Sequence, residues 1–359
     1  MQIILRSARY VLPVAFFSYA AVVILGYSKF PDRDEVTMDR TALTGSLTKK
    51  LDDVYRQSLP HRDPAIGVIG ALRYLAVGEG RKGVIAGADG WLYTAEEIRP
   101  MTEEIAVPLA RIAMVQRKLA QAGATLVIVP VPGKLDVHVD HSDAETAAGI
   151  GTLYDAFLAG LAAEGVAVLD ARAALKAEAA TDLAFFRTDT HWTPKGAKAV
   201  AEALATSGLI PPGDVAFSVA AAAEERFTGD LVSYVTTEGL APLIGLTSEA
   251  AAPYTASVAA AAGELDIFAG TEAGATLLIG TSYSANPTWS FAEALKLALG
   301  RDVLNLAVEG QGPARPMLDY LASPEFRDAP PEVVIWEFPV RYLSDPTVWD
   351  KQDRVKSGA

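Results

Sequence analysis

Three residues in two short stretches of this chain have the types that activate a hydroxyl nucleophile. Asp189 and His191 are separated by one residue, and Ser282 lies further along the chain. In an extended segment, side chains at positions i and i+2 point to the same side, so the Asp189 carboxylate can orient the His191 imidazole. A nucleophilic serine needs a base within hydrogen-bond reach and a third group that fixes the tautomer of that base. The spacing therefore predicts a Ser-His-Asp triad.

The neighbouring residues indicate where these side chains sit in a fold. Residues 275–280 form a short apolar run that ends in Gly280, which indicates a buried strand followed by a sharp turn. Ser282 then follows the carboxyl end of a strand, where α/β proteins place their chemistry. Thr193 and Pro194 mark the start of a helix directly after the histidine. Without catalysis, the same pattern describes a loop aspartate, a histidine before a helix and a serine after a strand.

The rest of the chain alternates between helical and strand patterns, which predicts an α/β fold with a parallel sheet and helices on both faces. Residues 211–274 break the alternation and are interpreted as an insertion with some strand pairing and no chemistry. A turn at 87–90 precedes a short strand at 91–93. Helices are expected at 65–77, 102–122, 147–163, 195–205, 287–300 and 313–321, and strands at 124–131, 166–169, 275–280, 303–308 and 333–338.

Five motifs resemble a known family. Asp189-Thr-His-Trp-Thr-Pro194 and Gly280-Thr-Ser-Tyr-Ser284 resemble the signature blocks of the alginate O-acetylation proteins AlgJ and AlgX, which have an SGNH-hydrolase-like domain. Further matches are Gly90-Trp-Leu-Tyr93, Pro132-Gly-Lys134 and Trp336-Glu-Phe-Pro-Val-Arg341. The Asp/His block precedes the serine block, the reverse of the order in ordinary SGNH hydrolases, so the motif order looks circularly permuted. Triads are defined by geometry and not by order, so the order does not oppose the prediction.

The resemblance implies an SGNH-hydrolase-like catalytic domain over residues 83–350 with the insertion at about 211–274. Residues 31–82 are then a linker or helical lead-in. Within the domain, Asn305 to Gly310 resembles the second SGNH block, whose glycine amide contributes to the oxyanion hole. Gly310 and the amide of Ser282 are therefore candidate oxyanion donors, and a plain turn is the alternative for Gly310.

Four further residues are candidates for oxyanion or substrate binding by their place in these motifs. Tyr283 adjoins the serine, and Arg341 falls near the position of the oxyanion asparagine of SGNH hydrolases, although Arg341 and Glu337 could instead form a structural ion pair. Lys134 could supply a cation to an oxyanion or a sugar carboxylate, or be a surface lysine. Trp192 could wall the pocket or stack on a sugar ring, or pack in the core.

Composition excludes several classes of protein. A net charge of −13 provides no basic surplus for a nucleic-acid binder, and it gives no overall attraction to a polyanion such as alginate. The chain has no cysteine, which rules out disulfides and thiolate catalysis. His138 and His141 match no metal-ligand spacing, and a solvated loop is the favoured interpretation. We therefore expect no metal and no cofactor.

The amino terminus has the pattern of a membrane-targeting segment. Arg6 and Arg9 precede an uncharged stretch at 10–28 that is close to the roughly 20 residues needed to cross a bilayer. Acidic residues follow it, which favours an amino terminus in the cytoplasm and residues 1–30 as an uncleaved anchor. A cleaved signal peptide is the alternative, with Ser18-Tyr-Ala20 as cleavage site, and a buried helix is a third option.

Together these observations predict a periplasmic O-acetyltransferase anchored to the bacterial inner membrane, with an exopolysaccharide as acceptor. Ser282 would carry the acetyl group, with His191 as base and Asp189 as orienting group. By resemblance, a membrane-bound O-acyltransferase partner would supply the acetyl groups. A carbohydrate acetylesterase with the same triad and a non-catalytic polysaccharide-binding scaffold are the alternatives.

Overall fold

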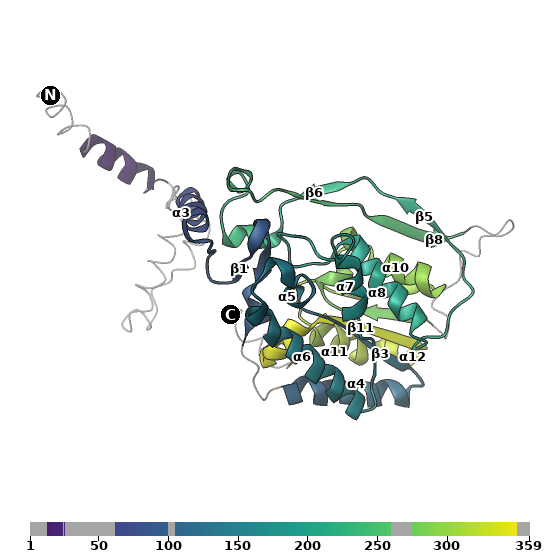
Figure 1. Ribbon diagram of the computed structural model, residues 1–359. Coiled ribbons are helices and arrows are strands. Elements are labelled where there is room, and N and C mark those ends of the chain that lie inside the picture. Colours follow the sequence, from purple (N-terminus) through teal and green to yellow (C-terminus); the bar gives the residue numbers. More distant parts are fainter. Residues whose placement is uncertain (1–12, 24, 26–61, 100–104, 260–274, 350–359) are drawn as a thin grey trace, which may run out of the picture.

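The computed structural model describes residues 13–23, 25, 62–99, 105–259 and 275–349 (Figure 1). Residues 31–61 of the predicted linker at 31–82 and most of the predicted anchor lie outside the described residues. An apolar helix is described at Pro13–Val23, which is shorter than a bilayer span. The predicted helix at 65–77 is confirmed as α3 (Arg62–Val77), which begins three residues earlier.

A five-stranded parallel sheet forms the centre of the fold, as predicted. Its strand order is β10-β9-β11-β3-β4, with β11 paired to β9 on one side and to β3 on the other. Every residue of β11 is buried, and its near-continuous apolar run is typical of a strand covered on both faces. The strands are β3 (Thr125–Val131), β4 (Ala167–Val168), β9 (Thr276–Ile279), β10 (Val303–Asn305) and β11 (Val333–Pro339).

Helices cover both faces of the sheet, and the alternation along β3 shows the two layers. Leu126 and Ile128 belong to one apolar cluster, whereas Val127, Val129 and Val131 belong to the other. The first cluster contains residues of α4 (Ala106–Gln121), α6 (Ala144–Ala163) and α11 (Ala314–Ala322), and the second contains residues of α7 (Arg172–Ala179), α8 (Pro194–Thr206) and α10 (Phe291–Leu299).

Helix α6 has the length and apolar composition of a membrane span. Among the described residues it is the one helix long and apolar enough to cross a bilayer. Its residues Ile150, Leu153, Phe157 and Leu161 are buried in the core against the sheet. A core helix of a soluble domain has the same length and composition, so α6 is explained by its packing.

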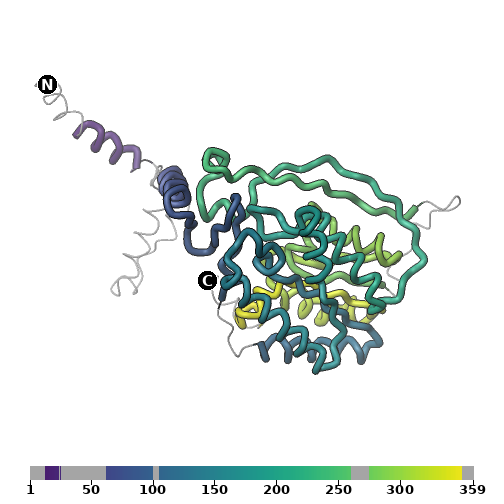
Figure 2. The backbone as a smooth tube through the Cα atoms, viewed as in Figure 1, coloured from purple at the N-terminus to yellow at the C-terminus, as the bar shows by residue number. Residues whose placement is uncertain are grey.

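The described part of the predicted insertion forms a long arm of paired strands. β5 (Phe217–Ala221) pairs with β8 (Tyr254–Val258), and β6 (Glu225–Phe227) pairs with β7 (Glu249–Ala251), both antiparallel. Figure 2 shows this arm crossing above α7, α8 and α10 toward α3. The expected strand pairing is therefore confirmed, and residues 260–274 lie outside the described part.

Two elements differ from the predicted pattern for identifiable reasons. The helix expected at 287–300 is split into η9 (Pro287–Trp289) and α10, because Ser290 takes a left-handed backbone conformation with φ 53°. Helix α7 was not predicted, and Leu175 is its one buried residue, so it has no apolar period to recognise.

The start of α8 makes a close backbone contact that we expect to be intolerant of any side chain. A Cβ at Gly196 would lie 2.2 Å from the carbonyl oxygen of Ala184. Gly196→Ala should lower the free energy of unfolding by about 1–3 kcal/mol, measured by urea denaturation. Gly149→Ala in α6 is the matched control, since no atom lies within 4 Å of its Cβ, and it should stabilise by up to about 1 kcal/mol. Equal stability of the two variants would contradict the contact.

Candidate active site

The Asp189 to His191 segment is a short loop fixed at both ends. Phe185 and Trp192 form an antiparallel bridge across it, and the Thr193 amide donates to the Ala184 carbonyl at 3.0 Å. The Thr193 hydroxyl then accepts from the Gly196 amide at 3.1 Å and caps α8, as expected from Thr-Pro at a helix start. The loop therefore has little freedom to move the side chains that it carries.

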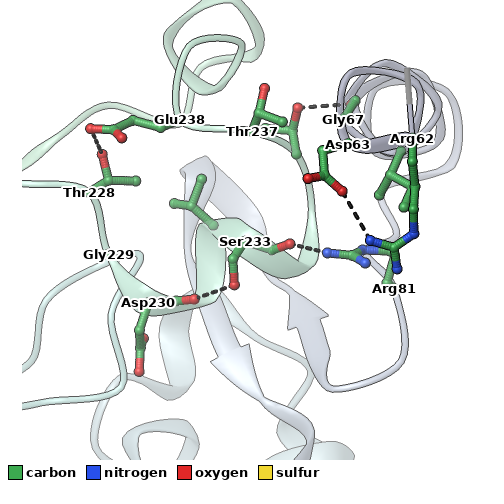
Figure 3. A pocket seen from close by; sticks show the side chains of 13 residues that line it. Arg62, Asp63, Gly67, Arg81, Thr228, Gly229, Asp230, Ser233, Thr237 and Glu238 are labelled. Carbon is green, nitrogen blue, oxygen red and sulfur yellow. Dashed lines mark hydrogen bonds and ion pairs between the residues drawn. The ribbon is translucent and has the colours of Figure 1, made fainter. Parts of the chain in front are cut away.

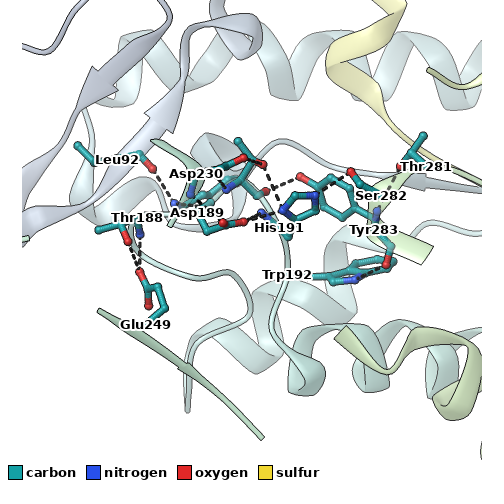
Figure 4. Close-up of polar contacts among 12 residues, drawn as sticks. Leu92, Thr188, Asp189, His191, Trp192, Asp230, Glu249, Thr281, Ser282 and Tyr283 are labelled. Carbon is teal, nitrogen blue, oxygen red and sulfur yellow. Dashed lines mark hydrogen bonds and ion pairs between the residues drawn. The ribbon is translucent and has the colours of Figure 1, made fainter. Parts of the chain in front are cut away.

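The structure brings Asp189, His191 and Ser282 into one hydrogen-bonded row (Figure 4). Asp189 Oδ1 lies 2.6 Å from His191 Nδ1, and His191 Nε2 lies 2.7 Å from Ser282 Oγ. With a proton on Nδ1, the ring presents an unprotonated Nε2 to the serine hydroxyl. This is the geometry in which an imidazole can take the proton of a serine nucleophile.

The Asp189 carboxylate is buried but well supplied with donors. The His191 amide donates to Oδ1 and the Asp230 amide donates to Oδ2, each at 2.9 Å. Burial alone would raise the pKa of Asp189, but the hydrogen bonds from the His191 ring and the two amides outweigh it and hold the pKa below its ordinary value. Asp189 is therefore a carboxylate at neutral pH.

Two acidic residues of the insertion hold the same loop, although no motif or spacing pointed to them. Asp230 accepts from the Thr190 amide at 2.9 Å and from its hydroxyl at 2.6 Å. Glu249 accepts from the Thr188 amide at 2.6 Å and from its hydroxyl at 2.7 Å. The expectation that the insertion has no part in the chemistry is thus corrected, because it fixes the loop on both sides of Asp189.

Lys134 lies beneath this loop and does not line the pocket. Its side chain is buried, and Nζ donates to the carbonyl oxygens of Leu92, Arg187 and Asp189 at 2.6, 2.8 and 3.0 Å. Burial lowers its pKa to about 8, so the group is mainly charged at neutral pH and all three ammonium protons are used. The expectation of a substrate-facing or surface lysine is corrected to a buried clamp on the backbone.

The serine loop has a buried carboxyl group of its own. Glu337 accepts from the Thr281 amide at 3.0 Å, from the Thr281 hydroxyl at 3.0 Å and from the Ser284 hydroxyl at 2.7 Å. Burial raises the pKa of Glu337, although these donors oppose the change. A Cβ at Gly280 would lie 2.5 Å from this carboxylate, which explains a glycine at the end of β9. Glu337 therefore fixes the turn that presents Ser282.

The loop that carries Asp189 and the loop that carries Ser282 are joined by three buried side chains, those of Tyr283, Arg341 and Trp192. The Arg341 guanidinium donates to the Tyr283 hydroxyl at 2.8 Å, the Tyr283 hydroxyl donates to the Thr190 carbonyl, and the Trp192 indole donates to the Tyr283 carbonyl at 3.0 Å. All three side chains are buried, and none lines the cavity at Ser282. The expected contact of Tyr283 and Arg341 with oxyanion or substrate is thus corrected to a structural role, and for Trp192 the alternative of packing in the core holds.

The ion pair considered between Arg341 and Glu337 is also absent from this buried network. Arg341 instead donates to the Glu96 carboxylate at 3.1 Å, and Glu337 accepts only the donors of the serine loop described above. Glu337 lies within β11, whereas Arg341 belongs to η10 (Val340–Ser344), which follows the strand. No third oxyanion donor is therefore placed by Arg341.

A cavity of about 310 Å³ opens at the row and has contributions from both the domain and the arm. Trp289 packs against the His191 ring with 5.1 Å between centroids and an angle of 21°. The amide oxygen of Asn286 accepts from the Thr288 amide at 3.0 Å. The cavity is lined by Asp189, His191, Glu225, Arg226, Phe227, Ser282, Asn286, Thr288, Trp289 and Glu309.

Gly310 directly follows a residue of this cavity lining. It is exposed and left-handed, with φ 69°. That conformation explains glycine at the turn after β10. Its amide as an oxyanion donor stays a prediction, as does the Ser282 amide at the start of the short helix α9 (Ser282–Ala285).

Asp189, His191 and Asp230 form the one group among the described residues whose ligand atoms lie close enough for a metal, within 4.8 Å of one another. Each carboxylate oxygen already accepts a hydrogen bond, from the His191 ring and amide, from the Asp230 amide, or from Thr190. These hydrogen bonds explain the cluster as the catalytic triad together with Asp230, which supports its loop.

His138 was expected in a solvated loop and is instead buried beside Trp91, with 4.4 Å between the ring centroids. Its Nε2 accepts from the Phe185 amide at 3.2 Å. Burial lowers its pKa to about 3, whereas the unfolded chain binds this proton near 6.5. The histidine is therefore a neutral acceptor at the base of the catalytic loop.

His138→Gln should flatten the acid dependence of stability. Between pH 6.5 and 3 the unfolded wild-type chain binds a proton that the folded chain excludes, so acidification destabilises the fold by about 1.4 kcal/mol per pH unit from this group. Glutamine keeps an acceptor and does not titrate. Urea denaturation from pH 7 to 4 measures the difference, with His141→Gln as control. Parallel curves for wild type and His138→Gln would contradict the buried neutral state.

Lys134→Met should destabilise the loop that carries Asp189, because it removes one buried donor from three carbonyl oxygens, although that of Arg187 keeps the Leu92 amide as a donor. We expect a loss of at least about 3 kcal/mol in the free energy of unfolding. Lys176→Met, which removes a partly exposed ion pair with Asp136, should change it by less than about 1 kcal/mol. Equal effects in chemical denaturation would show that Lys134 is not the clamp described.

Comparison with known proteins places this geometry in a family. Residues 84–340 match the family described as "SGNH hydrolase-like domain, acetyltransferase AlgX". The chain is 35% identical over 320 residues to the probable alginate O-acetylase AlgJ of Pseudomonas aeruginosa, covering 85% of this chain and 82% of that protein. It is 37% identical over 354 residues to that of Pseudomonas syringae pv. tomato, covering 94% and 89%.

Solved structures agree with the sequence matches. The O-acetyltransferase domain of Pseudomonas putida AlgJ matches with a TM-score of 0.65 and 35% identity, covering 73% of this chain and 93% of that one. Pseudomonas aeruginosa AlgX matches with a TM-score of 0.59 and 25% identity, covering 74% and 65%. The resemblance inferred from the motifs is thereby confirmed, and this chain belongs to the AlgX family of SGNH hydrolase-like acetyltransferase domains.

Proposed function

We propose that this protein is a polysaccharide O-acetyltransferase that works outside the cytoplasm through an acetyl-serine intermediate. The observation that carries the proposal is the row from Asp189 through His191 to Ser282, with successive distances of 2.6 and 2.7 Å, at an open cavity. The family is one of acetyltransferases, which indicates that the transferred group is acetyl. Ser282, His191 and Asp189 provide the nucleophile, its base and the group that orients the base.

In the first half of the reaction, Ser282 Oγ attacks the carbonyl carbon of an acetyl donor. His191 Nε2 takes the hydroxyl proton as the Oγ–C bond forms and returns it to the leaving group as the donor bond breaks. Asp189 remains ionised and stabilises the imidazolium. The Ser282 and Gly310 amides are our candidates for stabilising the oxyanion, each at about 3 kcal/mol.

In the second half, a sugar hydroxyl gives its proton to His191 and attacks the acetyl-serine. The ester bond to Ser282 breaks, and the proton returns to Oγ, which restores the enzyme. Water in place of the sugar would release free acetate. The outcome therefore depends on which hydroxyl reaches the cavity first.

The acceptor is proposed from the relatives and from the form of the cavity. The relatives are named alginate O-acetylases, so an alginate-like exopolysaccharide is our proposed acceptor. Trp289 and Phe227 supply aromatic surface of the kind that sugar rings contact, and Arg226 supplies a cation at the cavity. Glu225 and Glu309 line the same cavity, which favours a neutral group next to Ser282 and the uronate carboxylates further out.

The cellular setting is part of the proposal. The apolar stretch at 10–28 supports a periplasmic protein held at the bacterial inner membrane by this uncleaved segment; cleavage of the segment as a signal peptide, the alternative, would release the body into the periplasm. We propose a membrane-bound O-acyltransferase as the partner that brings acetyl groups to the donor side. A membrane partner of this kind would explain how an activated acetyl group reaches an enzyme outside the cytoplasm.

The transfer reaction can be tested with an activated acetyl ester and uronic-acid oligosaccharides. We expect mass spectrometry to find acetyl groups on the sugar, and the rate to fall by at least about a hundredfold in Ser282→Ala and in His191→Ala. Ser142→Ala and His141→Ala are matched controls away from the cavity and should keep wild-type rates. Acetate release without sugar acetylation would favour an esterase, and full acetylation of polymer in cells that carry Ser282→Ala would favour a scaffold.

A further inference from the structure

Helix α3 presents an apolar face to solvent. Val68, Ile69, Leu72 and Leu75 are 48%, 66%, 61% and 62% exposed. Nineteen large apolar residues are exposed in the described part of the chain, and five of them belong to α3. Singly exposed apolar residues are common, but a row along one helix marks an interaction surface.

The opposite face of α3 is fixed to the insertion, so the apolar face cannot turn inward. A Cβ at Gly70 would lie 1.9 Å from the Val235 carbonyl oxygen, and one at Gly67 would lie 2.6 Å from the Thr237 side chain. The Thr236 hydroxyl also donates to the Gly67 carbonyl at 2.9 Å. Figure 3 shows this seat, with Gly67 and Asp63 facing Thr237 and Ser233.

Charge around α3 differs from that of the whole chain. Residues 62–82 contain four basic residues and two acidic ones, a net charge of +2, whereas the chain as a whole carries −13. The basic residues are Arg62, Arg73, Arg81 and Lys82. Arg62 pairs with Asp63 and Arg73 pairs with Glu79, so Arg81 and Lys82 carry the positive surplus. An apolar face beside a positive surplus suits a helix that lies in the plane of an anionic bilayer surface.

The position of α3 in the chain also points to a lipid bilayer as the surface that it contacts. Leu25, which is 62% exposed, ends the described apolar N-terminal segment, and α3 begins at Arg62. A second cluster of exposed apolar residues therefore precedes α3 in the chain, made up of Val14, Phe16, Phe17, Tyr19, Val22 and Leu25. Leu243, 78% exposed in η8 (Ala241–Ile244), extends the apolar surface beside α3.

We propose that the outer face of α3 docks on the surface of a lipid bilayer with anionic headgroups. Val68, Ile69, Leu72 and Leu75 enter the interface between headgroups and acyl chains, and Arg73 remains at headgroup level. This contact is separate from the N-terminal segment, because α3 is part of the folded body. It fixes the orientation of the body relative to the bilayer surface.

The insertion connects helix α3 with the candidate active site. The end of η7 (Asp230–Tyr234) is joined to the segment after α3, since the Arg81 amide donates to the Tyr234 carbonyl at 2.8 Å, and Val235, the next residue, lies against Gly70 of α3. The first residue of η7 is Asp230, whose amide donates to Asp189. One short element thus connects the membrane-facing helix with the triad acid, so the cavity lies on a body of fixed orientation at the bilayer.

The absence of cysteine makes a site-specific test direct. Full-length variants Ile69→Cys and Leu72→Cys, each labelled with an environment-sensitive fluorophore, would be reconstituted in phosphatidylcholine vesicles that contain phosphatidylglycerol. Lys198→Cys on α8, whose native side chain is 60% exposed in its ion pair, is the matched control. Nitroxide groups on lipid acyl chains and iodide in the buffer are the two quenchers.

The proposal predicts that acyl-chain nitroxides quench the labels on α3 at least about twofold, with iodide excluded, and that the Lys198→Cys label shows the reverse. Iodide quenching of the α3 labels at the level of the control would overturn it. Shielding of the α3 labels from both quenchers would also overturn the proposal, because such shielding indicates a contact between two protein copies. Thermal unfolding of each labelled variant at the wild-type temperature shows that the readout comes from the native fold.

Discussion

The Asp189 carboxylate is the charge on which the site depends. A buried carboxylate is expensive unless donors surround it, and here the donors are the His191 ring, the His191 amide and the Asp230 amide. Two of these belong to the loop itself and the third comes from the insertion. The same bonds that make the charge tolerable also orient the imidazole toward Ser282, so stability and chemistry have a common cause.

Most buried polar groups of the fold serve the two loops that carry the triad. Lys134 holds the carbonyl side of the Asp189 loop, and Glu337 holds the amide side of the Ser282 loop. Arg341 and Tyr283 connect the two loops from behind. Groups of this kind add little stability over an apolar core, but each leaves an unpaired partner when removed, which fixes one geometry. Preorganisation of the row explains why so many charges are buried there.

The sequence was most informative where local pattern decides structure. The parallel sheet, the cap at Thr193 and the turn after β9 follow from periodicity, capping residues and glycine. Motif resemblance predicted the family, and the spacing of Asp189 and His191 predicted their hydrogen bond. The roles of Lys134, Tyr283, Arg341 and Trp192 could not be read in this way, because a motif shows that a residue matters and not which way its side chain points. Their partners lie on segments far away in the sequence.

The insertion contains residues that support the site but that no sequence pattern could identify. Asp230 and Glu249 lie in an alanine-rich stretch without motif or period, and they act through a backbone amide and through two threonines. Trp289 and Asn286 follow the serine block and could have been suspected from their position after a strand end. Only the folded arrangement shows that Trp289 packs on the His191 ring.

The most direct test of the account is to trap and map the acyl-enzyme. The full-length protein would be mixed rapidly with an activated acetyl ester in the absence of acceptor, quenched in acid and digested for peptide mass spectrometry. We expect one acetyl group per chain, on the peptide that contains Ser282, formed in a burst in the wild type and far more slowly in Asp189→Asn. Acetyl transfer to sugar without any acetyl-serine at this position, or an undiminished burst in Asp189→Asn, would contradict the account.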